Sequence, residues 1–149
     1  MTNIRITKEF RFEMAHALLG YDGLCSNIHG HSYKLSVTLI GKPSAEISDP
    51  KNGMVIDFGE LKSIVRKEII ENFDHALVLN DATPDKNEIT SLPLFKKVIF
   101  LSYQPTCENM LDDFAQRISK CLSSKIKLHS LRLRETNDSF AEWFAEDNR

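Results

Sequence analysis

Two runs in which apolar and polar residues alternate constrain the fold of this chain more than any other feature. In the first run, the even positions carry Ile4, Ile6, Phe10, Phe12, Met14 and His16. In the second run, the odd positions carry His29, His31, Tyr33, Leu35, Val37 and Leu39. Because a β-strand sends alternate side chains to opposite faces, both runs predict strands whose histidines share the apolar face. If the strands pair as antiparallel neighbours, the three imidazoles converge.

Three imidazoles on one face favour a metal site. Zinc accepts neutral imidazole nitrogen as a ligand, and three protein ligands leave a fourth position open for water or substrate. A single histidine on an apolar face is more simply a hydrogen-bonded core residue, but three on one parity favour the metal.

Cys25 lies four residues before His29 and has two interpretations that the sequence leaves open. Its thiolate can act as a base or nucleophile beside the metal, because a nearby cation lowers the pKa of a thiol. Alternatively, Cys25 is the fourth ligand of a closed structural zinc site.

Helical spacing follows the two strands and then recurs later in the chain. Asp57 caps a predicted helix that ends near Phe73. Thr106 caps a second helix, whose apolar stripe includes Cys121, so we expect Cys121 in the core.

Alternation returns near the end of the chain. Residues 131–135 predict a strand, and residues 140–144 return as its hairpin partner. Residues 80–97 are expected to be irregular and to lead into a short strand-like run at 98–101. Together the elements predict an α+β fold with a four-stranded antiparallel sheet and two helices inserted between the strand pairs.

Composition limits the class of protein. A chain of 149 residues predicts one domain, 1–149. Its 19 basic and 21 acidic residues give a net charge of -2, which provides no overall attraction to nucleic acid. Apolar stretches are too short to span a membrane, and three cysteines without a repeating spacing favour reduced thiols. We expect a soluble, cytoplasmic protein.

Asp74 and His75 directly follow the first predicted helix. An aspartate beside a histidine can orient or charge the imidazole, but a histidine at a helix end can also simply interact with the helix dipole. Glu108 has a simple explanation as a favourable acid in the first turn of the second helix.

Glu135 has the inward parity of its strand, where an unpaired charge is costly. A carboxylate there can accept two parallel hydrogen bonds from the N-C-N edge of a pterin or guanine ring. Alternatively, it is solvated at the strand end, or pairs with Arg132 or Arg134.

Six segments together resemble the 6-pyruvoyl-tetrahydropterin synthase and 6-carboxytetrahydropterin synthase family. The His-Gly-His segment alone is a weak signal, but six motifs in the family's order over nearly the whole chain make a strong one. They are Phe12-Glu-Met-Ala-His16, Cys25-Ser-Asn-Ile-His-Gly-His-Ser-Tyr33, Met54-Val-Ile-Asp-Phe58, Phe73-Asp-His75, Pro105-Thr-Cys-Glu-Asn109 and Leu133-Arg-Glu-Thr136.

The resemblance implies a tunnelling fold, in which trimers close their sheets into a barrel, two trimers commonly stack as a hexamer, and active sites lie between subunits. It also implies 7,8-dihydroneopterin triphosphate as the substrate. Carried over by motif, the roles it implies are zinc ligands for His16, His29 and His31, a catalytic thiol for Cys25, a proton relay for Asp74 and His75, a pterin anchor for Glu135, and a pocket lining for Thr106 and Glu108.

Three residues separate Cys25 from His29, as in the carboxy-forming enzymes of queuosine and other deazapurine pathways, whereas pyruvoyl-forming enzymes usually carry a longer spacing. The resemblance therefore favours 6-carboxy-5,6,7,8-tetrahydropterin, acetaldehyde and triphosphate as products. The alternatives are a pyruvoyl-forming synthase, a hydrolase that uses zinc hydroxide, and a non-catalytic structural zinc protein. Two features depart from the family: a long stretch from Asn80 to Ser102, and Cys107 where a small residue is more usual.

Overall fold

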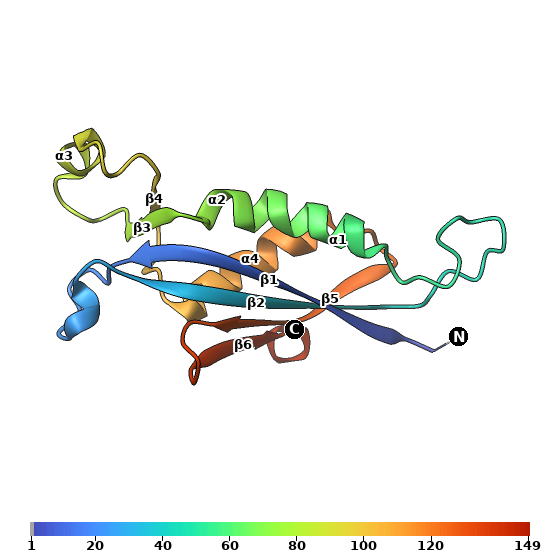
Figure 1. Cartoon of the computed structure of the whole chain (residues 1–149). Helices are drawn as coiled ribbons and strands as arrows, with labels where there is room; N and C mark the ends of the chain where they lie inside the picture. The colour runs from blue at the N-terminus through green and yellow to red at the C-terminus, as the bar shows by residue number, and fades with distance from the viewer. Residues whose placement is uncertain (1) are drawn as a thin grey trace.

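A computed structural model describes residues 2–149 as a mixed six-stranded sheet with helices against one face (Figure 1). The sheet order is β4-β3-β1-β2-β5-β6. The strands are β1 (Ile4–His16), β2 (His29–Gly41), β3 (Ala76–Asn80), β4 (Val98–Leu101), β5 (Ile126–Arg134) and β6 (Phe140–Phe144). The helices are α1 (Phe58–Val65), α2 (Glu71–Phe73), α3 (Lys86–Ser91) and α4 (Cys107–Cys121), with a π segment η2 (Arg66–Ile70) and 3-10 turns η1 (Leu24–Ser26) and η3 (Ala145–Asn148).

The long strands β1 and β2 pair antiparallel, as their alternation predicts. Their register places His16 opposite His29 and Met14 opposite His31. The inward residues of β1 are buried from Phe10 to His16, while the residues between them remain more exposed. The parity of the sequence is therefore confirmed over both strands.

The prediction of a four-stranded, fully antiparallel sheet is wrong. Strand β3 pairs parallel with β1, and β4 pairs parallel with β3. The strand-like run at 98–101 is confirmed as β4, but β3 was missed because its residues from Ala76 to Leu79 are all buried and therefore do not alternate. The region expected to be irregular also contains the short helix α3.

The first predicted helix is continuous from α1 through η2 to α2. Asp57 accepts hydrogen bonds from the backbone N–H groups of Gly59 and Glu60, which confirms the predicted cap. Its buried stripe of Leu61, Val65, Ile69 and Phe73 faces the sheet. The π segment η2 adds a wider turn without ending the helix.

Helix α4 packs against both the sheet and the first long helix. Thr106 accepts a hydrogen bond from Asn109 N–H, so its cap is also confirmed. The ring of Phe114 packs edge-on against Phe12 and Phe73, with centroid separations of 6.5 and 5.0 Å. The expectation that Cys121 lies in the core is wrong: it is exposed at the last position of the helix, beyond the buried stripe that ends at Ile118.

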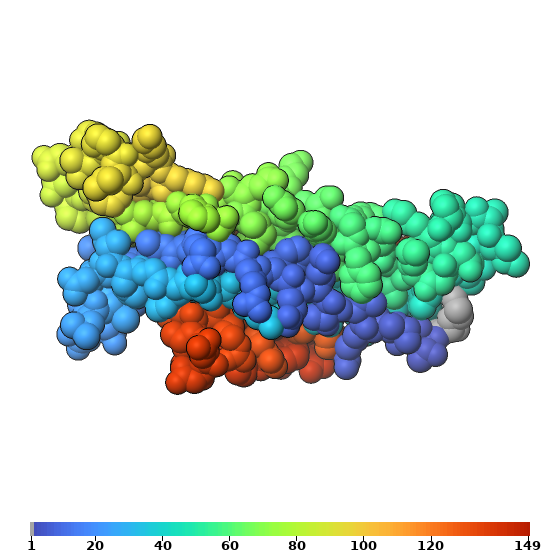
Figure 2. Space-filling view, viewed as in Figure 1, coloured from blue at the N-terminus to red at the C-terminus, as the bar shows by residue number. Residues whose placement is uncertain are grey.

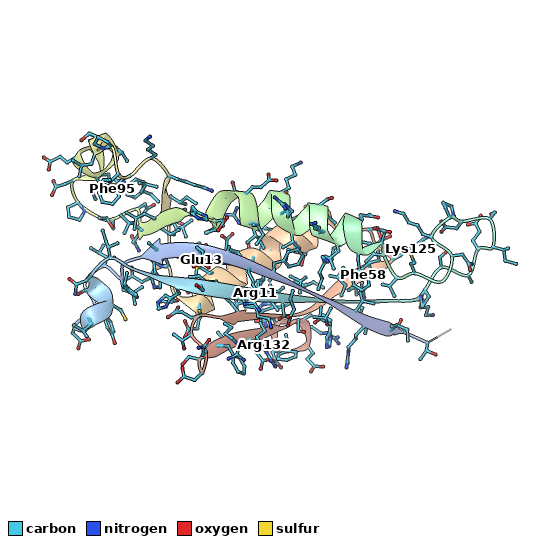
Figure 3. All side chains as sticks on the ribbon, viewed as in Figure 1. Arg11, Glu13, Phe58, Phe95, Lys125 and Arg132 are labelled. Atoms are coloured by element: carbon cyan, nitrogen blue, oxygen red, sulfur yellow. The ribbon has the colours of Figure 1, made fainter. Side chains whose placement is uncertain are left out.

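The face of the sheet away from the helices is polar. Arg11 and Glu13 on β1 and Arg132 on β5 have the parity opposite to the buried residues, and Figure 3 shows them along this face. In Figure 2 the segment around α3 (yellow) lies at the same end of the elongated molecule as the loop after β1 (light blue). No helix within residues 2–149 has the length and apolar character needed to cross a membrane.

Candidate metal centre and adjoining cavity

Three imidazoles meet where β1 ends and β2 begins. One ring nitrogen from each of His16, His29 and His31 lies within 4.8 Å of the other two. The Nε2 atoms of His16 and His29 are 3.1 Å apart, and the three ring centroids are 4.6 to 5.2 Å from one another. The structure thus brings together the histidines that share parity in the sequence, in an arrangement that can hold a metal ion.

Two backbone carbonyls determine which ring nitrogens carry protons. A carbonyl only accepts, so His16 Nδ1 donates to Pro105 O, and His29 Nδ1 donates to Asn27 O, both at 2.7 Å. The Nε2 atoms of the neutral rings then carry free lone pairs. His31 Nε2 is buried and has no hydrogen-bond partner within residues 2–149. Buried lone pairs facing one another suit a shared cation, and the carbonyl partners orient the rings as in known metal sites.

Burial also keeps the cluster in the form that binds metal. His16 is 2% exposed, and this burial lowers its pKa despite the opposing effects of the hydrogen bond to Pro105 and the charge of Glu135. Burial likewise lowers the pKa of His31. Neutral imidazole is the ligating form, so these two rings are ready for a metal at neutral pH.

Cys25 lies in the turn η1 and lines a cavity of about 310 Å³ beside the histidines. His16 forms part of the same wall, together with Thr106 and Glu108 at the start of α4 and Glu135 after β5. Cys25 is half-buried and is not among the ligand atoms that lie within 4.8 Å of one another. The thiol therefore stands next to the cluster rather than within it.

Glu135 faces inward, as its parity predicts, and its two oxygens have different surroundings. Oε2 accepts hydrogen bonds from Tyr33 OH at 3.4 Å and Cys107 Sγ at 3.2 Å. Oε1 lies 3.4 Å from His31 Nε2. The carboxylate therefore connects the cavity with the histidine cluster.

The basic residues on β5 do not pair with Glu135. Arg132 forms a 2.7 Å ion pair with Glu142, and Arg134 donates to Asn137 O at 2.8 Å. Both arginine side chains also lie over the ring of Phe140. The alternative of an arginine partner for Glu135 is therefore wrong, while its side chain is 27% exposed at the end of the strand.

Asp74 is held at the end of the first long helix. Its Oδ1 accepts the backbone N–H of Glu13 at 2.9 Å and lies 3.1 Å from His75 Nδ1. The Glu13 N–H is the main reason that the pKa of Asp74 is lowered, so the carboxylate stays charged. His75 has φ of 59°, a left-handed conformation that a non-glycine residue adopts rarely and at some energetic cost.

His75 and Cys25 do not meet within one chain. The side chain of His75 is 77% exposed and lines a separate hollow of about 690 Å³, together with Glu13, His31 and Ser32. Cys25 does not line this hollow. The residues that the sequence grouped as a proton relay are thus divided between two hollows of one chain.

Sequence reasoning missed two groups that touch the site. Tyr33 has the parity of His29 and His31, which was the available signal for its inward position. Cys107 was noticed only as an unusual residue, and its contact with Glu135 joins positions that are 28 residues apart. No local pattern predicts such a contact.

Known structures show the same fold. An uncharacterized protein from Wolinella succinogenes superposes with a TM-score of 0.81 at 19% identity, covering 97% of this chain and 99% of that one. The 6-pyruvoyl tetrahydropterin synthase of Caenorhabditis elegans gives a TM-score of 0.68 at 24% identity, covering 97% of both chains. The chain is thus a T-fold protein with a three-histidine centre.

The sequence comparisons identify its family. The family model described as 6-pyruvoyl tetrahydropterin synthase matches residues 5–146, so the chain belongs to this family. A 6-carboxy-5,6,7,8-tetrahydropterin synthase from Haemophilus influenzae is 38% identical over 141 residues, covering 93% of this chain and 97% of the relative. The protein of that name from Rickettsia bellii is 31% identical, covering 93% and 99%.

Proposed function

We propose that this protein is a zinc-dependent 6-carboxy-5,6,7,8-tetrahydropterin synthase. It converts 7,8-dihydroneopterin triphosphate to 6-carboxytetrahydropterin, acetaldehyde and triphosphate, as a cytoplasmic step towards queuosine or another deazapurine. The observation that carries the proposal is the cavity in which the thiol of Cys25, the carboxylate of Glu135 and the imidazole of His16 meet.

His16, His29 and His31 would hold the zinc ion. The neutral state of the buried rings and the unpartnered His31 Nε2 support this assignment. When bound, zinc supplies a Lewis acid that lowers the pKa of substrate hydroxyl groups and of the adjacent C–H groups. The separation of Cys25 from the mutually close nitrogens supports a site that is open to substrate over a closed structural one.

The cavity residues divide the remaining tasks. Glu135 accepts hydrogen bonds from the N-C-N edge of the pterin, while Thr106 and Glu108 line the ring pocket. Cys25, as a thiolate, removes a proton from the substrate side chain. Its place in the cavity that His16 and Glu135 also line suits this role.

Asp74 and His75 complete the proton relay from a neighbouring subunit. In one chain they do not line the cavity of Cys25, and the exposed His75 lines a separate hollow. A trimer or hexamer with active sites between subunits would join the two halves. Asp74, whose Oδ1 lies 3.1 Å from His75 Nδ1, would then keep His75 oriented.

The product decides between two branches of the family. The short spacing between Cys25 and His29 and the names of the relatives favour the carboxy product. Elimination of triphosphate to the pyruvoyl product is the alternative, since the family model carries that name.

Incubation with 7,8-dihydroneopterin triphosphate followed by mass identification of the pterin tests the proposal. Carboxy product with acetaldehyde supports it, and pyruvoyl product moves the protein to the other branch. Absence of conversion contradicts the lyase assignment for this substrate. X-ray absorption supplies a second test, because a zinc–sulfur distance of about 2.3 Å in the resting protein would indicate a structural site with Cys25 as a ligand.

A further inference from the structure

We propose that Cys107 is a positioning residue for Glu135: its thiol, together with the Tyr33 hydroxyl, holds one carboxylate oxygen and so fixes the orientation in which the carboxylate meets the pterin. This inference rests on the proposed role of Glu135 as the ring anchor. It assigns a task to the residue that most departs from the family pattern.

The geometry concentrates both donors on one oxygen. Cys107 Sγ lies 3.2 Å from Glu135 Oε2, and Tyr33 OH lies 3.4 Å from the same atom. The remaining oxygen, Oε1, accepts no hydrogen bond from residues 2–149 and lies 3.4 Å from His31 Nε2. The carboxylate therefore has one oxygen engaged by protein donors and one that remains available to a ligand.

Both donors are themselves fixed. Tyr33 is 1% exposed, and its ring stacks on Phe12 with a centroid separation of 5.1 Å. Cys107 is 8% exposed and is the first residue of α4, directly after the capping residue Thr106. Neither side chain can follow Glu135 if the carboxylate rotates, so the two contacts restrict its orientation.

The Cys107 thiol also stays protonated. Burial raises its pKa, and the neighbouring charge of Glu135 adds to the effect. It therefore keeps the hydrogen that it donates to Oε2. Cys107 acts as a neutral donor, which separates its task from that of Cys25 in the same cavity.

Removing the thiol should affect binding more than turnover. Without the Cys107 donor, the carboxylate of Glu135 gains rotational freedom and can leave the orientation in which its Oε1 lies 3.4 Å from His31 Nε2. The pterin then binds only after the carboxylate is reoriented, which raises KM. Once the ring is bound, the groups that move protons are unchanged, so kcat is largely retained.

A matched set of variants tests the proposal. Cys107→Val removes the donor while filling a similar volume, Cys107→Ser keeps a donor, and Cys121→Val is a control at an exposed cysteine. Affinity is measured by fluorescence titration with neopterin, which lacks the triphosphate, and KM and kcat are measured with the full substrate. We expect Cys107→Val to weaken neopterin binding and raise KM by about tenfold, as for loss of one hydrogen bond to a charged group. Cys107→Ser and Cys121→Val should stay within about twofold of the wild type, well below that tenfold effect.

The proposal is overturned if Cys107→Val binds neopterin as tightly as the wild type, or if Cys107→Ser loses as much affinity as Cys107→Val. Cys107 is then only a packing residue. If Cys107→Val does not fold, Cys107→Ala is measured against the same expectation. Glu135→Ala separates this inference from the proposed function. If Glu135→Ala binds neopterin as tightly as the wild type, the assignment of Glu135 as the ring anchor is wrong. If Glu135→Ala loses binding while Cys107→Val does not, only the positioning role of Cys107 fails.

Discussion

His16 Nε2 and His29 Nε2 lie 3.1 Å apart while both rings donate through Nδ1 to backbone carbonyls. Two neutral rings held in this way have no proton between their Nε2 atoms. The lone pairs then face one another. A metal cation between them stabilises this arrangement, whereas a proton can bind there only by placing a charge on a buried ring, which is costly. Several expectations about the metal centre come from this relationship.

The metal-free protein should lose stability as the pH falls. Burial lowers the pKa of His16 below its ordinary value of 6.5, so the unfolded chain binds a proton more readily than the folded one. This contribution is fully present above about pH 6.5 and is lost as the pH falls from there towards the folded-state pKa. Denaturant titrations in chelator between pH 8 and 5 measure it. His16→Asn should reduce the slope, and a pH-independent midpoint in the wild type contradicts the expectation.

Replacing one cluster histidine should release the metal. His31→Ala is expected to weaken zinc affinity by at least about 100-fold, because even the loss of an outer partner of a metal ligand costs 10- to 100-fold. Metal content after dialysis and a competitive chelator titration measure the effect. His129→Ala, away from the cluster and packed near Phe144, should keep the metal. Retention of zinc by His31→Ala would place the site elsewhere.

Cys25→Ala should abolish turnover while zinc stays bound. A positioned proton-transfer group contributes about 10² to 10⁴ in rate, so we expect a loss within that range. Turnover and zinc content are measured on the same samples, with Cys121→Ala as the cysteine control. Parallel loss of zinc and turnover would instead indicate that Cys25 is a ligand.

Two inactive variants should restore activity when mixed. Cys25 and His75 lie in separate hollows of one chain, so the proposed site between subunits would take one from each copy. Co-refolding Cys25→Ala with His75→Ala in equal amounts should recover up to about one quarter of wild-type activity, since a quarter of the sites receive both intact residues. Unmixed variants, refolded separately, are the controls. Absence of recovery argues that both residues act within one chain.

Phe114 should be among the most sensitive core positions. It is fully buried between Phe12 and Phe73, so Phe114→Ala is expected to cost about 3–5 kcal/mol of unfolding free energy. Denaturant midpoints measure the change. Ile47→Ala, at a side chain that is 95% exposed, should change stability by less than about 0.5 kcal/mol. Similar losses of stability at both positions would contradict the placement of Phe114 in the core.

Strand parity could be read from the sequence because it is a local property. The inward positions of His16, His29 and Glu135 follow from alternation along each strand, and the caps at Asp57 and Thr106 follow from residue type and spacing. These predictions are confirmed in the structure because each depends on neighbours only a few residues away.

Strands β3 and β4 illustrate why the rest was missed. A strand buried on both faces has no alternation, and its parallel pairing with β1 depends on a crossover through the long helix. The exposure of Cys121 likewise depends on how far along α4 the packing against other elements extends, which helical spacing alone does not reveal.

By itself, therefore, the sequence determined the identity and facing of the three histidines, because side-chain periodicity is a property of one strand at a time. Only the tertiary structure decided which groups surround them. The contact of Glu135 with Tyr33 joins residues 102 positions apart, and His75 and Cys25 line separate hollows of one chain. Such relationships arise from the packing of distant segments, for which local patterns carry no information.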